Sequence, residues 1–201
     1  MARGARYRVQ VRRRREGKTD YKARKAFVLS GLPRLVTRGS LRNITAQIVT
    51  AKPAGDQVLA AAHSNELRKK YGWKAPTGNV PAAYLTGFLC GLKAKKEGVK
   101  EAILDIGLTA PTKGSRLFAV LKGALDAGVE VPHDESKLTK ERMKGEHIAQ
   151  YSKLLGSGSE EYAAKFSKYL KNELSPEKLP EHFLKVKADI VSSFKSEGEK
   201  E

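Results

Sequence analysis

Basic side chains with the chemistry to bind phosphate are concentrated near the N-terminus, in the stretch RRRREGKTDYKARK that covers residues 12–25. Eight of these fourteen residues are cationic. Arginine presents a flat, permanently charged fork of donors that suits phosphate oxygens and stacks on bases. Four consecutive arginines cannot all face one flat surface, but an RNA groove can surround an extended chain. The stretch therefore predicts contact with a nucleic acid.

The alternatives for an arginine run are a solvated tail and a nuclear localisation signal. Contact is favoured because the cations continue through Lys18 into a predicted helix, and because Tyr7 and Tyr21 offer rings for an unstacked base. On side-chain chemistry, the predicted contact residues besides the arginine run are Arg3, Arg6, Tyr7, Arg8, Lys18, Tyr21, Lys22, Arg24 and Lys25.

A second basic cluster is RKKYGWKAPTGN, residues 68–79. It interleaves charge and aromatic rings on a loop that contains glycine, and its candidate RNA-contacting residues are Arg68, Lys69, Lys70, Tyr71, Trp73 and Lys74. The alternative is an ordinary charged connection with one buried tryptophan, and the sequence does not decide between the two.

A third cluster is TAPTKGSR, residues 109–116, which joins a predicted strand to a predicted helix. Lys113, Arg116 and the amides at the helix N-terminus could together hold one phosphate. The order Lys-Gly-Ser does not match a nucleotide-binding P-loop, which needs Gly-Lys-Ser/Thr. A plain strand-to-helix turn is the alternative.

The distribution of charge along the chain is more informative about the partner than the total net charge. The net charge of +17 and a pI near 9.9 are typical of proteins with a nucleic-acid partner. A heat-adapted surface rich in Lys and Glu is a second explanation, but such a surface would be balanced. The excess lies at one end instead, with +12 over residues 1–50, +5 over 51–150 and zero over 151–201. This asymmetry indicates a directed anion-binding arm.

Several classes of function lack the residues that they need. Cys90 is the only cysteine and lies in an apolar helical pattern, so we expect an inert buried thiol and a reducing compartment. The four histidines have no ligand spacing, so neither a metal nor another cofactor is expected. No membrane span, secretory signal or small-molecule substrate is expected. Asp105 has no evident acidic companion and no nucleophile–base set can be placed, so an enzyme is not expected.

The elements that would position these residues follow from hydrophobic periodicity. Residues 1–18 are expected to be an arm that orders only on its partner, and Thr19 or Asp20 to cap a helix through Leu29. Strands are predicted at 34–38, 43–51 and 56–64, paired antiparallel, with a further strand at 102–108. Helices are predicted at 79–96 and 115–128, and a stripe of small residues should let the first lie close to the sheet.

The predicted fold class is α/β, with a layer of helices on a sheet. We expect a basic arm and short helix at 1–30, a core domain at 31–132, and a polar linker with a helical extension at 133–201. Within the extension, helices are predicted near 146–155, 159–174 and 180–196. The extension is expected to pack on the core domain or on a neighbouring molecule.

Four segments in order resemble one protein family over about the first 150 residues: RRRREGKTDYKARK, NVPAAYLTGFLCGLKA, ILDIGLTAPTKGSRLFAVLKGALDAGVEVPH and ERMKGEHIAQY. They are similar to the archaeal and eukaryotic form of the large-subunit ribosomal protein that binds 5S ribosomal RNA, the universal L18 family. The last 50 residues match weakly, so their role stays open.

The resemblance implies a ribonuclease-H-like core with a mixed sheet and without catalytic carboxylates. It implies a non-enzymatic role in the cytoplasm as a structural part of the large ribosomal subunit. There the chain would bind 5S rRNA and attach it to large-subunit rRNA and neighbouring proteins in the central protuberance. Carried over residue by residue, the implied RNA contacts are Arg12, Arg13, Arg14, Arg15, Lys18, Thr19, Tyr21 and Arg24.

Two other functions remain as alternatives. One is a ribonuclease-H-like nuclease that uses Asp56 and Asp105, which predicts metal-dependent cleavage of an RNA–DNA hybrid. The other is a general nucleic-acid-compacting protein, which predicts similar affinity for duplex DNA and 5S rRNA.

Overall fold

The sheet is the centre of the computed structural model, which describes the backbone of residues 4–198 and side chains through residue 195. Its strands are β1 (Arg34–Gly39), β2 (Ile44–Lys52), β3 (Gly55–His63) and β4 (Ile103–Asp105), in the order β3-β2-β1-β4. The first three strands pair antiparallel, as predicted, and β4 pairs parallel with β1. The prediction of an α/β fold with a mixed sheet is confirmed.

Alternation along the strands places apolar side chains on one face of the sheet. Leu35 of β1 and Ile44, Ala46 and Ile48 of β2 are fully buried against helices. Val36, Gln47 and Val49 lie on the opposite face, where they line a cavity. One face of the sheet therefore packs into the hydrophobic core. The other face, with Val36, Gln47 and Val49, lines the cavity, and we call it the platform face.

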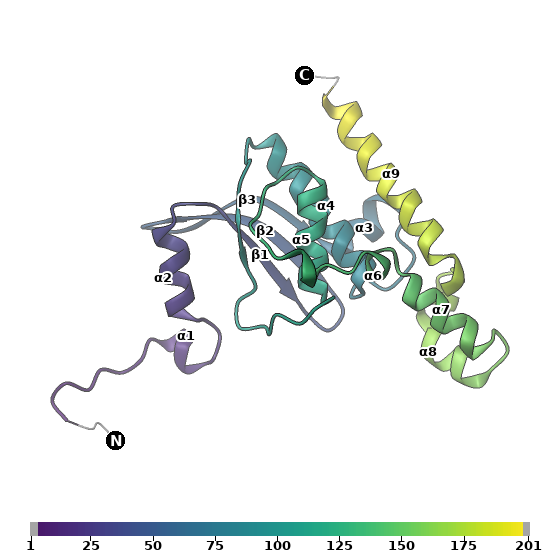
Figure 1. Ribbon diagram of the computed structural model, residues 1–201, viewed down its shortest axis with the longest axis horizontal. Coiled ribbons are helices and arrows are strands. Elements are labelled where there is room, and N and C mark those ends of the chain that lie inside the picture. The colour runs from purple at the N-terminus through teal and green to yellow at the C-terminus, as the bar shows by residue number, and fades with distance from the viewer. Residues whose placement is uncertain (1–3, 199–201) are drawn as a thin grey trace.

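Helices α4 (Val80–Lys96) and α5 (Arg116–Asp126) pack together on the core face (Figure 1). A Cβ on Gly87 would lie 2.1 Å from the Val120 carbonyl oxygen, and one on Gly123 would lie 2.2 Å from that of Tyr84. The expected stripe of small residues on α4 exists, but its glycines admit the neighbouring helix rather than the sheet. Cys90, from the same stripe, does face the sheet, near the Ala60 carbonyl.

Three short helices were not predicted. They are α1 (Arg12–Arg15), α3 (Ser64–Lys70) and α6 (Lys140–Lys144). In α3, the side chain of His63 accepts from Asn65 N, and Glu66 accepts from His63 N, so a capping box closes the first turn. The segment from Arg68 to Lys70 is thus helical, whereas we expected a loop.

The C-terminal third is built from α7 (Glu146–Leu155), α8 (Glu160–Lys171) and α9 (Leu179–Gly198), with 3-10 turns η1 (Glu135–Lys137) and η2 (Pro176–Lys178). Their buried faces, including Phe166, Phe183 and Ile190, belong to the same hydrophobic cluster as the sheet and α4. Of the two alternatives, packing on the core domain or on a neighbouring molecule, the structure shows the contact with the core domain. Among the helices of residues 4–198, none combines the length and apolar character that crossing a membrane requires.

Candidate nucleic-acid interface

Helix α2 (Tyr21–Leu29) presents the second half of the basic stretch and begins where the sequence predicted. Asp20 adopts extended backbone, and its Oδ1 accepts from Lys22 N at 2.9 Å and from Ala23 N at 3.2 Å. These bonds satisfy amides that the first turn of a helix leaves free. Gly17, with a φ of +61°, allows the chain to turn between α1 and α2.

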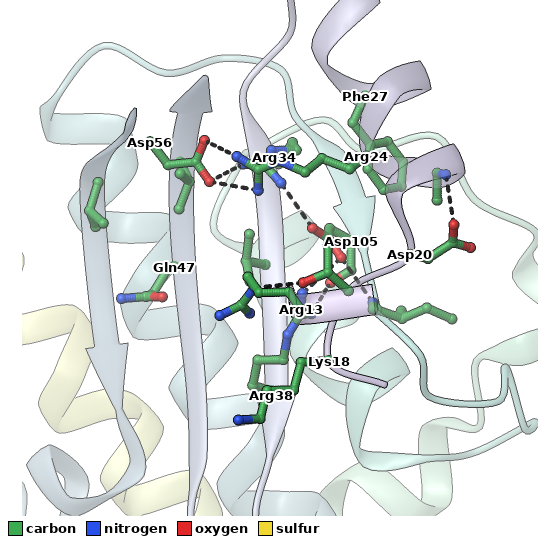
Figure 2. Close-up of a pocket in the computed structure, with 17 residues that line it drawn as sticks. Arg13, Lys18, Asp20, Arg24, Phe27, Arg34, Arg38, Gln47, Asp56 and Asp105 are labelled. Carbon is green, nitrogen blue, oxygen red and sulfur yellow. Dashed lines mark hydrogen bonds and ion pairs between the residues drawn. The ribbon is translucent and has the colours of Figure 1, made fainter. Parts of the chain in front are cut away.

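A paired salt bridge docks α2 on the platform face of the sheet. Arg24 donates from Nη1 to Asp56 Oδ2 at 3.0 Å and from Nη2 to Asp56 Oδ1 at 2.8 Å. None of the side chains of α2 is fully buried. The helix is therefore held by this two-pronged contact and by the partly buried ring of Phe27, which lines the cavity beneath it (Figure 2).

The network continues into the sheet. Arg34, on β1, donates to Asp56 Oδ2 at 2.7 Å and to Asp105 Oδ2 at 3.1 Å, and Arg38 donates to Asp105 Oδ1 at 3.0 Å. Burial disfavours the charged form of Asp56, but the hydrogen bonds and charges of Arg24 and Arg34 outweigh it, so its pKa lies below the ordinary value. Asp56 is therefore charged at neutral pH and pairs with both arginines.

The same network bears on the nuclease alternative. Both carboxylate oxygens of Asp105 accept from arginines, and Oδ1 also accepts from Gly107 N at 2.9 Å. Asp56 is likewise shared by Arg24 and Arg34. In the part of the chain that the structure describes, no three Asp, Glu, His or Cys residues gather as metal ligands would. The two candidate catalytic acids act as anchors for arginine.

Between α2 and the sheet lies a cavity of about 390 Å³. Arg13, Lys18, Arg38 and Gln47 line it, together with the Arg24–Asp56 pair. Figure 2 shows these side chains converging from α1, the linker before α2, and the strands. Residues of the arm and of the platform face therefore line one cavity.

The predicted arm residues are mostly exposed. Arg6, Arg8, the run Arg12–Arg15, Lys18, Lys22 and Lys25 are all exposed, and Tyr7 is 52% exposed. Tyr21 is partly buried. Thr19 accepts from Arg13 Nε at 2.8 Å, which links α1 to the start of α2. Arg3 lies outside the described residues.

The second cluster is only partly available to a ligand. Arg68, Lys69, Lys70 and Lys74 are exposed, whereas Tyr71 is partly buried with its hydroxyl 3.3 Å from Ser193 Oγ. Trp73 is 1% exposed and stacks on His182 with ring centroids 5.1 Å apart. The prediction that Trp73 contacts RNA is wrong, because its ring is sealed between α3 and α9; the alternative of a buried tryptophan holds.

The third cluster does not form the expected phosphate site. Lys113 is exposed, but Arg116 turns back into the protein, where its Nη1 donates to the carbonyls of Ser40 at 2.8 Å and Gly78 at 3.1 Å. The prediction for Arg116 is therefore corrected: the side chain braces two backbone turns. A strand-to-helix turn, the alternative, describes this segment.

Sequence reasoning missed Arg34 and Arg38 as members of the interface. A signal was present, because Arg34 and Arg38 are four apart in a strand and must lie on one face with Val36. What the sequence did not show was that Asp56 and Asp105, from two other strands, would meet them there.

Comparison with known proteins agrees with these observations. A family model described as "Ribosomal large subunit proteins 60S L5, and 50S L18" matches residues 5–102 and 92–134. The chain is also 52% identical, over 204 residues, to "Large ribosomal subunit protein uL18" of Caldivirga maquilingensis, a match that covers 100% of this chain and 99% of that protein. The chain thus belongs to the family of large-subunit ribosomal proteins that contains L5 of the 60S and L18 of the 50S subunit, a family of structural proteins rather than enzymes.

Proposed function

We propose that the chain binds 5S rRNA and attaches it to large-subunit rRNA and neighbouring proteins in the central protuberance of the ribosome. The observation that carries the proposal is the unneutralised charge of the arm. Among the described residues, no carboxylate pairs with Arg6, Arg8, Arg13, Arg14, Arg15, Lys22 or Lys25. Phosphates of an RNA would supply the missing counter-charge.

The docked helix α2 gives the arm its direction. Because the Arg24–Asp56 pair fixes α2 on the sheet, the chain before Gly17 leaves the core at a defined place. The helical turn α1 spreads four arginines around its axis, since successive residues of a helix lie about 100° apart. RNA that wraps this turn can reach all four, which a flat surface cannot.

The finer fold assignment is part of this proposal. A β3-β2-β1-β4 order, with three antiparallel strands and a parallel fourth reached through α4, supports a ribonuclease-H-like core. On such a core the arm supplies charge and the sheet supplies a rigid platform.

The test is binding of 5S rRNA by the full chain and by a chain that lacks residues 1–18. If the arm makes six or more phosphate contacts, the affinity of the full chain falls by about 10³-fold or more between 50 and 200 mM salt. The truncated chain should bind more weakly with a smaller salt dependence while remaining folded. Equal affinity of the two chains would end the proposal for the arm.

A matched control tests whether RNA affinity depends on the position of the charges in the arm or only on the total charge of the chain. Replacing Arg12–Arg15 by alanine removes four charges from the arm. Replacing Lys140, Lys144, Lys153 and Lys178, all exposed and elsewhere, removes the same number. Only the first variant should lose affinity strongly. Competition with duplex DNA at moderate salt then distinguishes 5S rRNA binding from general compaction of nucleic acids, for which both ligands would compete equally.

A further inference from the structure

A polar groove of about 540 Å³ lies far from the arm, between α3, the β1–β2 turn, the loop before α4, and α8. All four asparagines of the chain, Asn43, Asn65, Asn79 and Asn172, line it. We call it the amide groove. Figure 1 shows α8 at the opposite end of the molecule from α2, so the groove is separate from the arm.

Two of the asparagines, Asn43 and Asn172, are held by the protein at one end of the amide and remain open at the other. Asn43 Oδ1 accepts from Thr77 Oγ1 at 2.9 Å, and Asn172 Nδ2 donates to the Lys74 carbonyl at 2.6 Å. Within residues 4–198, no partner is recorded for Asn43 Nδ2, Asn172 Oδ1 or the side-chain amide of Asn65. Asn79 differs, because it caps α4 and donates to the Tyr169 hydroxyl. The groove thus offers both donors and acceptors in fixed places.

Cations surround these amides without counter-charges. Arg42, Arg68 and Lys168 line the groove from three different elements, and all three are exposed. No carboxylate lines the groove, and none of the described acids pairs with these three side chains. The cavity under α2 is different, since Asp56 and Asp105 pair there with Arg24, Arg34 and Arg38. The amide groove is therefore positive and ready for an anionic ligand.

The floor of the groove is rigid. Arg116 donates from beneath to the carbonyls of Ser40 and Gly78, and the one hydroxyl proton of Thr77 is shared between the Arg42 carbonyl at 2.8 Å and Asn43 Oδ1 at 2.9 Å. A Cβ on Gly78 would lie 3.0 Å from the carbonyl oxygens of Leu41 and Arg42, so the two loops touch through their backbones. The amides of Asn43 and Asn172 are consequently held in place before a ligand arrives, which lowers the entropy cost of binding.

We propose that the amide groove binds an unpaired segment of ribosomal RNA, whose base edges meet the open amides and whose phosphates meet Arg42, Arg68 and Lys168. An asparagine amide donates and accepts at once, as a base edge does. An acidic peptide also offers backbone donors and acceptors to the amides, so binding of a poly-glutamate peptide is compared with binding of RNA in the experiment below. Leu41, 90% exposed at the rim, adds an apolar surface against a base. The proposal rests on the proposed function in that its ligand is ribosomal RNA.

The sharpest variant is Asn65→Asp, which keeps the size of the side chain and changes its charge. Asn65 lies in the first turn of α3, where a carboxylate is favourable to the helix, so folded stability should be unchanged or higher. In the groove the same carboxylate removes the amide donor and repels phosphate. We expect affinity for 5S rRNA or for large-subunit rRNA, measured separately with the full chain, to fall by about tenfold.

Neighbouring residues on α8 supply the matched control. Lys168→Ala and Lys171→Ala each remove one exposed charge from the same helix, but Lys171 does not line the groove. Arg68→Ala and Lys168→Ala should each reduce the salt slope of binding by about 1. Lys171→Ala should leave it unchanged. Dimethyl sulfate methylates unpaired adenine and cytosine. The wild-type chain should protect at least one such nucleotide from methylation, and Asn65→Asp should not protect it.

Different outcomes overturn the two proposals. If truncation of the arm weakens 5S rRNA binding while Asn65→Asp, Arg68→Ala and Lys168→Ala change neither RNA affinity nor protection, the amide groove is not an RNA site and the proposed function stands. If these variants instead lose only the binding of a poly-glutamate peptide, the groove is a peptide site and the inference fails. If the full chain does not bind 5S rRNA at all, the proposed function fails, and the groove is then judged on large-subunit rRNA alone.

Discussion

At the scale of single residues, Arg34 connects the two acids of the platform face, Asp56 and Asp105. Its side chain is 4% exposed and lies between Asp56 and Asp105, so one buried guanidinium pairs with two carboxylates. Its loss would leave Asp105, whose side chain is 8% exposed, with the half-exposed Arg38 as its remaining cation, while Asp56 keeps Arg24. Because both acids retain a partner, we expect Arg34→Met to lower the free energy of unfolding by about 2–3 kcal/mol in urea denaturation.

Arg38 is the natural control, because it pairs with the same Asp105 but is itself 48% exposed in its side chain. Arg38→Met should cost about 1 kcal/mol or less, since solvent screens the pair. The double variant Arg34→Met with Asp105→Leu should recover part of the loss by replacing the buried pair with apolar contact. Equal small losses for Arg34→Met and Arg38→Met would contradict the role given to Arg34.

At the scale of elements, the contact of α4 with α5 depends on two glycines. Alanine is the better helix former by about 1 kcal/mol, so on propensity alone Gly87→Ala should stabilise the protein. The close packing of α4 on α5 rules out this stabilisation, because the new Cβ would lie 2.1 Å from the Val120 carbonyl oxygen. We expect Gly87→Ala and Gly123→Ala each to reduce the free energy of unfolding by about 3 kcal/mol or more.

Gly158→Ala is the control for those variants. Gly158 has no atom within 4 Å of the position of a Cβ and no positive φ, so its replacement should change stability by less than about 0.5 kcal/mol. Thermal unfolding of the three variants side by side decides the sign. A stabilising Gly87→Ala would mean that the two helices are further apart than the structure places them.

These elements also show what periodicity can and cannot predict. The Asp20 cap, the strand faces and the small-residue stripe of α4 depend on spacing within one segment, and the sequence predicted them. Which neighbour a stripe meets depends on tertiary packing, so the partner of Gly87 was wrongly predicted to be the sheet. Helix α3 was missed because only Ser64 and Leu67 are buried in it, too few to show a period.

At the scale of the whole molecule, the charge asymmetry was predictable by counting, but the path of the C-terminal third was not. Residues 133–201 looked like a separable extension because they are polar at the start and neutral in charge. In the structure, Leu179, Phe183, Val186 and Ile190 of α9 are buried in the common hydrophobic cluster. Sequence pattern gave each apolar stripe but no pairing between stripes. The same is true of the amide groove, whose four asparagines come from distant segments.

Removal of α9 tests whether the C-terminal third is part of the core. Trp73, the only tryptophan, lies against His182, whose pKa is lowered by burial and by the charges of Lys74 and Lys185. The neutral imidazole accepts from Lys74 N at 3.1 Å and keeps the ring in place. A chain that ends at Lys178 should therefore expose Trp73, and its fluorescence should shift to longer wavelength.

The free energy of unfolding of the chain that ends at Lys178 should also be lower than that of the full chain. Each large apolar side chain that α9 buries contributes about 1.5–3 kcal/mol, so loss of Phe183, Val186 and Ile190 together approaches the whole stability of a typical domain. His182→Ala should give the fluorescence shift with a smaller loss of stability. If the chain without α9 keeps both the emission wavelength of Trp73 and its unfolding transition, the C-terminal extension is a separate unit. If it loses both, the extension, whose residues 151–201 carry no net charge, is part of the folded core to which the basic arm is attached.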